Sequence, residues 1–93
     1  MAFTGDTVKL KVHFKDFDGQ VVDPVGITLK VFNERKEQIG QTINITETNK
    51  IEMGIYEYTY TLPDVDGDLI LEFAGNNSGS PIVVRKSINI TFV

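Results

Sequence analysis

Apolar and polar residues alternate along much of this chain, most regularly near its beginning. The segment 7–15 carries an apolar residue at every second position: Val8, Leu10, Val12 and Phe14. Successive side chains of a β-strand point to opposite faces of a sheet, so this pattern places all four on the same face. We therefore expect a half-buried strand here, with lysines and one histidine on its outer face.

The same alternation, stronger in some segments than in others, predicts six further strands. They span residues 27–32, 38–46, 48–53, 54–62, 68–74 and 82–92. Turn-forming residues separate these strands. Asp18-Gly19 suits a turn with positive φ, and Pro63 ends a strand because it cannot continue a ladder of hydrogen bonds. The polar stretch 75–81 predicts a loop.

Seven short strands, with no segment of helical periodicity, predict an all-β fold. Turn signals about every eight to twelve residues favour a seven-stranded antiparallel immunoglobulin-like β-sandwich, and a small closed barrel is the alternative. A chain of 93 residues is too short for two cores. We therefore expect residues 1–5 to form a short N-terminal tail and residues 6–93 to form a single domain.

Composition strengthens the prediction of β structure and excludes several kinds of chemistry. Ile, Val and Thr account for ten, ten and nine of the 93 residues, whereas Ala occurs twice. Side chains branched at Cβ pack well on sheets and lose rotamer freedom in helices. The chain has no cysteine and one histidine, which excludes disulfides, thiol nucleophiles and multi-histidine metal sites.

The charge of the chain narrows the range of partners. Thirteen acidic and nine basic residues give a net charge of −4, which provides no general basic surface for nucleic acid or an anionic membrane. The one histidine, His13, lies on the polar face of the first predicted strand, and no motif places a nucleophile beside it. We expect no enzyme activity, no catalytic residue and no cofactor.

Five residues are candidates for an interaction surface. Phe32, Ile70 and Val83 fall at positions that the alternation assigns to outward faces, and they form a patch for another subunit if the fold makes them neighbours. Lys9 and Lys11 lie on the polar face of the first strand, where they either dock an acidic partner or prevent edge-to-edge pairing of sheets. We favour the second interpretation.

Two other patterns have a plainer structural interpretation. Asp64, Asp66 and Asp68 have the spacing of the first ligands of a calcium loop, but the glycine and glutamate positions of an EF-hand do not match, which favours solvated turns. The three tyrosines of segment 54–62 share one face, as in a stacking platform for bases or sugars. Their alternation with polar residues favours a place in the core.

The order of the segments resembles a known family. Its motifs here are G-D-T-V-K-L-K-V-H-F-K-D-F-D-G near the start, then G-I-Y-E-Y-T-Y-T-L-P and G-D-L-I-L-E-F. They resemble the turn and core residues of bacterial and phage immunoglobulin-like modules over nearly the whole chain. Copies of this length are similar to small accessory structural proteins of tailed phages that infect Gram-positive bacteria.

The resemblance implies a non-enzymatic protein of the virion head, tail or baseplate, made in the host cytoplasm. Its implied partners are other virion proteins or further copies of itself, with weak host-surface glycan contact as a lesser role, and neither nucleic acid nor membrane. The first residues lack the basic and apolar pattern of a signal peptide, which favours this setting. The alternative is a carbohydrate- or cell-wall-binding module of a bacterial surface protein or secreted enzyme.

Overall fold

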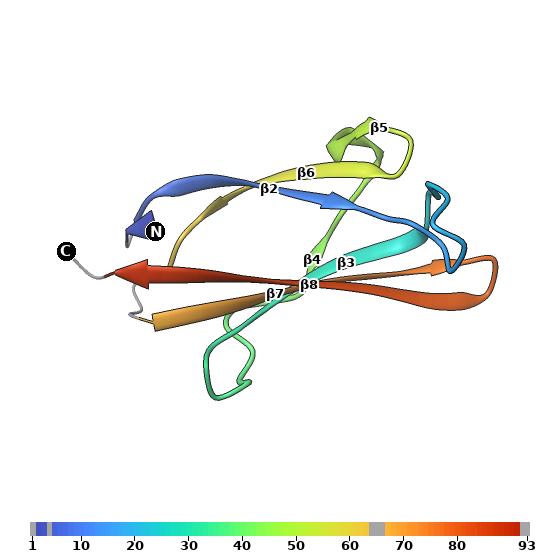
Figure 1. Cartoon of the computed structure of the whole chain (residues 1–93). Helices are drawn as coiled ribbons and strands as arrows, with labels where there is room; N and C mark the ends of the chain where they lie inside the picture. The colour runs from blue at the N-terminus through green and yellow to red at the C-terminus, as the bar shows by residue number, and fades with distance from the viewer. Residues whose placement is uncertain (1, 4, 64–66, 92–93) are drawn as a thin grey trace.

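Two β-sheets, stacked face to face, make up the fold (Figure 1). The structure is a computed structural model and describes residues 2–3, 5–63 and 67–91. Its strands are β1 (Ala2–Phe3), β2 (Thr7–His13), β3 (Val25–Phe32), β4 (Ile43–Asn44), β5 (Lys50–Glu52), β6 (Ile55–Thr61), β7 (Gly67–Asn77) and β8 (Ser80–Thr91). One turn of 3-10 helix, Glu47–Asn49, precedes β5.

The two sheets differ in size and have no strand in common. The larger has the order β1-β8-β7-β3-β4 and the smaller the order β2-β6-β5. Neighbouring strands are antiparallel, except that β1 runs parallel to β8. The prediction of an all-β sandwich is confirmed, and the separate sheets exclude the closed barrel.

The core lies between the sheets and consists of the residues that the alternation assigned to inward faces. On the smaller sheet, Val12 and Phe14 are fully buried, and Val12 lies opposite Tyr56. Tyr58 and Tyr60 pack against the same core from the next inward positions of β6, which agrees with a structural role for the tyrosine row. The larger sheet contributes Ile27, Leu29, Val31, Leu69, Leu71 and Phe73.

The described part of the chain has eight strands rather than the predicted seven. The additional strand, β1, pairs Ala2 and Phe3 with the end of β8, so it falls within residues 1–5, which we expected to be a tail. A strand of two residues is too short for any alternation to show. The predicted core position Phe92 lies outside the described residues.

Two predicted boundaries were wrong, and backbone conformation explains both. The predicted strand 38–46 is reduced to β4, because Gly40 adopts a φ of +73° and interrupts the extended run. The predicted loop 75–81 is instead a continuous hairpin of β7 and β8. Its two-residue turn, Ser78-Gly79, has φ values of +52° and +85°, as tight hairpin turns require.

Candidate functional site

Three connections meet at one end of the sandwich, the right-hand end in Figure 1, and together they form what we call the loop end. They are the β2–β3 connection (14–24), the β5–β6 turn (53–54) and the β7–β8 turn (78–79). Most of the exposed large apolar residues of the described chain lie in or near these connections: Phe17, Val21, Val25, Met53 and Val83. This clustering makes the loop end the first candidate for an interaction surface.

Phe17 lies at the tip of a small ordered turn in the β2–β3 connection. The Asp16 carboxylate accepts hydrogen bonds from the backbone N–H groups of Asp18 and Gln20, at 2.9 and 2.8 Å. The backbone N–H of Asp16 donates a hydrogen bond to the carbonyl of Gln20, and the carbonyl of Asp16 accepts one from the N–H of Gly19. Gly19 also supplies the positive φ that closes the turn. The turn is therefore held by its own hydrogen bonds and does not depend on contacts of the Phe17 ring.

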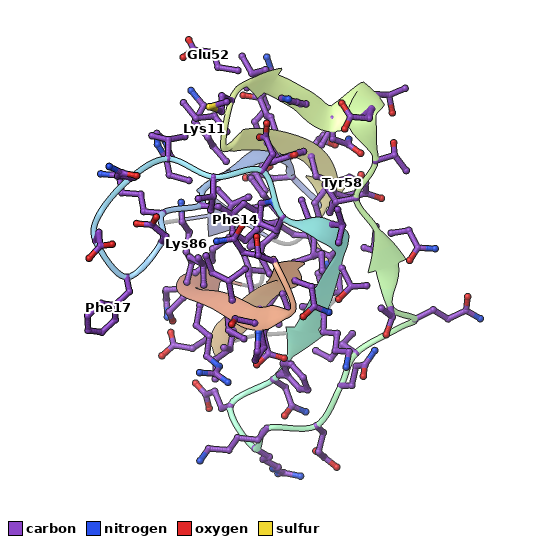
Figure 2. All side chains as sticks on the ribbon, turned by 90° about the vertical axis from the view of Figure 1, so that its right-hand side faces the viewer. Lys11, Phe14, Phe17, Glu52, Tyr58 and Lys86 are labelled. Carbon is purple, nitrogen blue, oxygen red and sulfur yellow. The ribbon has the colours of Figure 1, made fainter. Side chains whose placement is uncertain are left out.

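The Phe17 side chain points away from the rest of the molecule (Figure 2). Its relative exposure is 104%, the highest of the exposed large apolar residues. A shallow hollow lies beside it, between the turn and the β7–β8 hairpin. The hollow is lined by Lys15, Asp16, Phe17, Asn77, Ser80, Pro81, Ile82 and Val83. The site residue Val83 thus lies close to Phe17, a residue that we had assigned only to the turn.

A polar cluster around Asp23 fixes the base of the loop end. The Asp23 carboxylate accepts hydrogen bonds from the Lys50 ammonium at 2.8 Å, from the Gly54 N–H at 2.6 Å and, at 3.4 Å, from the Tyr56 hydroxyl. The Lys50 hydrogen bond, followed by the Gly54 N–H, lowers the pKa of Asp23 below its ordinary value. The cluster joins the β2–β3 connection to β5 and β6, and each of its groups is engaged in this structural contact.

A second hollow lies on the outer face of the larger sheet, and we call it the outer hollow. Phe32 and Ile70, two of the predicted site residues, are cross-strand partners here and both are half-buried. Lys36, Glu72 and Arg85 complete the lining of a depression of about 430 Å³. Arg85 binds Glu72 at 2.8 Å, so the positive charge of Lys36 has no acidic counterpart within the lining.

The two predicted lysines lie on the other side of the molecule. Lys9 and Lys11 face outward from β2, opposite Thr59 and Glu57 of β6. β2 is an edge strand of the smaller sheet, which is the position where lysines oppose sheet-to-sheet pairing. Lys86, on β8 of the larger sheet, donates a hydrogen bond to the backbone carbonyl of Lys11 across the open side of the sandwich.

The structure therefore distributes the five predicted site residues over three places. Phe32 and Ile70 come together in the outer hollow, Val83 lies beside the loop end, and Lys9 and Lys11 remain apart from both. Phe17 is the main residue that the sequence analysis missed. The sequence does indicate that Phe17 is exposed, since a phenylalanine flanked by two aspartates in an Asp-Gly turn has no inward face to occupy.

The remaining sequence candidates supply no further site. Asp64 and Asp66 lie outside the described residues, and the Asp68 carboxylate accepts a hydrogen bond from Asn89 at 3.0 Å. In the ranges 2–3, 5–63 and 67–91, no three His, Cys, Asp or Glu residues are grouped as metal ligands would be. Within the same ranges, no helix has the length and apolar character needed to cross a bilayer.

Comparisons with known proteins add no family assignment. No protein-family model, no curated protein and no solved structure matches this chain. The function must therefore be argued from the surfaces described above.

Proposed function

We propose that this protein is a non-enzymatic binding module that recognises another protein through its loop end. The single observation that carries the proposal is Phe17, a fully exposed phenylalanine on a turn that is ordered without it. Exposing so large an apolar side chain to water is unfavourable, and burying the side chain of a phenylalanine is favourable by about 1.5–3 kcal/mol relative to leaving it exposed. A residue of this kind is typical of an anchor that is buried when a partner binds.

The rigidity of the turn supports this role. Ordering a flexible loop on binding costs conformational entropy, and a loop already fixed in its bound shape avoids that cost. The Asp16 carboxylate fixes the backbone that follows Phe17, because it accepts hydrogen bonds from the N–H groups of Asp18 and Gln20. Behind the turn, Lys15 and Val21 form an antiparallel bridge that closes its base. The ring is thus presented on a firm support.

The connectivity supports an immunoglobulin-like assignment of the sandwich. If β2, β3, β5, β6, β7 and β8 are taken as strands B, C, D, E, F and G, the sheets contain B-E-D and G-F-C, as in immunoglobulin domains. The loop end then carries the B–C and F–G loops. These are two of the loops with which antibody variable domains bind their antigens, so the site lies where this architecture commonly carries recognition.

The proposed setting is a phage particle, in which the module is an accessory protein of the head, tail or baseplate. Its support is the resemblance of the turn and core motifs. Carbohydrate binding, the alternative class, finds less support, because the tyrosines considered for a sugar platform lie on the inner face of β6 and pack against the core.

Site-specific photo-crosslinking tests the proposal. A benzoylphenylalanine at position 17, in the full chain expressed during phage production, is expected to form covalent adducts with a structural protein of the purified particles. The matched control carries the same group at Thr59, which is exposed on the outer face of the smaller sheet. Equal labelling from both positions, or absence of the chain from the particles, contradicts the proposal.

A further inference from the structure

We propose that one partner of the loop end is a second copy of this chain, whose outer hollow receives Phe17. The inference rests on the proposed function of the loop end as a protein-binding surface and names its occupant. It joins two apolar features that the described chain leaves accessible, one projecting and one concave.

The lining of the outer hollow suits an aromatic ring. Phe32 and Ile70 lie side by side as cross-strand partners, and each is only half-buried within its own chain. A phenyl ring packs favourably against another in an edge-to-face arrangement, and the neighbouring isoleucine adds aliphatic surface. The hollow, of about 430 Å³, is large enough for the Phe17 side chain with room for part of its turn.

The charges around the two surfaces have opposite signs. Phe17 is flanked by Asp16 and Asp18, and with Lys15 the tip of the turn has a net charge of −1 (one base, two acids). The lining of the hollow holds Lys36, Arg85 and Glu72, a net charge of +1 (two bases, one acid). The protein as a whole has a charge of −4, so this positive lining departs from its general character. Complementary charges favour the proposed register of the two copies.

The two surfaces lie at different places, so one copy can use both at once. Strand β3 begins at the loop end with Val25 and reaches Phe32 at its other end, and the molecule is 42 Å along its longest axis. In Figure 1 the strands run along this direction, which separates the tip from the hollow. The two copies either exchange both contacts across a two-fold axis, as a closed dimer, or repeat one contact head to tail, as a ring or a filament.

Two complementary variants test this arrangement. Phe17→Ser removes the tip and retains the hollow, and Ile70→Glu places a negative charge in the hollow that repels the acidic tip, while its own tip is retained. We expect the wild-type chain to associate, as a dimer or a larger oligomer, as its concentration is raised in sedimentation velocity. Each variant alone should associate at least about tenfold more weakly than the wild-type chain, because the contact of the anchor residue is lost. An equimolar mixture of the two should form a 1:1 dimer and no larger species, because only one tip and one hollow remain.

Charge exchange provides a second measurement that does not depend on the apolar contact. Asp18→Lys and Lys36→Glu are each expected to weaken association about threefold, the size of an exposed ion pair, and mixing the two variants should restore it. Lys9→Glu makes the same charge change as Lys36→Glu on the outer face of the smaller sheet, and it should change the affinity much less. Circular dichroism of every variant checks that the fold is retained.

The outcomes separate this inference from the function on which it rests. A wild-type chain that stays monomeric at millimolar concentration, or a mixture of Phe17→Ser and Ile70→Glu that forms no dimer, overturns the inference. If position 17 then still crosslinks to another virion protein, the binding role of the loop end stands with a different partner. If position 17 crosslinks to nothing, both proposals fail.

Discussion

Phe14 and Phe17 are three positions apart in the chain and lie in opposite environments. Phe14 has a relative exposure of 0%, and its ring meets that of Tyr56 edge to face, with 5.8 Å between centroids. Phe17 has a relative exposure of 104% (Figure 2). The same side chain is thus part of the core at one position and fully exposed to solvent at the other. Substitutions should separate these two roles.

The two regions are nevertheless joined through the backbone. The N–H of Phe14 donates to the carbonyl of Gly54 at 2.7 Å, and its own carbonyl accepts from Val22 at 3.1 Å. These bonds attach both ends of the β2–β3 connection, and the β5–β6 turn, to the top of the core. Because both bonds use backbone atoms, they link the turn that carries Phe17 to the core without any contact of the Phe17 ring.

The largest expected effect is that of Phe14→Ala. Removing a fully buried phenylalanine leaves a cavity beside Tyr56, and the free energy of unfolding should fall by about 3–5 kcal/mol. Phe17→Ala is the matched control and should change stability by less than about 0.5 kcal/mol, because the residue has no packing to lose. Urea denaturation followed by circular dichroism measures both. Equal losses at the two positions would show that Phe17 packs against the fold in solution.

The contrast between these residues also marks how far the sequence predicts the molecule. Phe14 was predicted as a core residue because Val8, Leu10, Val12 and Phe14 alternate, and the face of a strand follows from its period of two. Turn residues have no such period, so Phe17 was assigned to a turn but not to a surface. Backbone geometry at Asp16 and Gly19, which is local and specific, determines where the ring points.

Long-range pairing limited the prediction of the site in a similar way. The outward positions of Phe32 and Ile70 followed from alternation within each strand, but their contact depends on the register between β3 and β7. That register is set by the packing of the whole sheet and includes a shift between Val25 and Thr28. Pairing between strands that are distant in the chain leaves no mark in the alternation of either strand.

The second prediction concerns Gly54, the link between core and loop end. Gly54 has a φ of +74°, and a Cβ there would lie 2.2 Å from the Val21 side chain and 3.0 Å from the Phe14 carbonyl oxygen. Gly54→Ala should lower stability by about 2–4 kcal/mol through backbone strain and overpacking together. Gly19→Ala is the control, since φ is +84° but no atom lies within 4 Å of the added carbon. It should cost only the strain, about 1–2 kcal/mol. Equal costs in thermal or urea denaturation would contradict the close packing at Gly54.

A smaller effect is expected at Asp23, and it depends on pH. The hydrogen bond from Lys50 is the main cause that lowers the pKa of Asp23 from its ordinary 3.8. The unfolded chain therefore binds the proton more tightly than the folded one. The stabilising contribution is complete above about pH 4 and is lost as the pH falls through the lower, folded value. Asp23→Asn should reduce stability at pH 7 by about 1 kcal/mol or less, because the ion pair is partly exposed.

The pH profile distinguishes this ion pair from a general effect of charge. Asp23→Asn should flatten part of the decline in stability that begins as the pH falls below about 4. Asp18→Asn, which removes one negative charge from an exposed residue of the same connection, is the control for net charge. Parallel profiles for wild type and Asp23→Asn in urea denaturation at several pH values would contradict a stabilising pair with Lys50.

A small change in stability is also expected at Lys86, which belongs to neither region. It lies opposite Leu71 on the inner row of β8, between Val84 and Ile88, yet it is exposed because β1 pairs only with the far end of the strand. An inward-pointing lysine at an open edge hinders another strand from pairing there. Lys86→Leu continues the apolar row and should change stability by less than about 1 kcal/mol, but it should increase light scattering over time.

The control for this prediction is the outward substitution Ser87→Leu, which adds the same side chain without removing the charge of Lys86. If Ser87→Leu aggregates as fast as Lys86→Leu, the protection comes from low surface hydrophobicity rather than from the charge at the edge. If only Lys86→Leu aggregates, the charge of this one lysine keeps the open edge of β8 free of other strands.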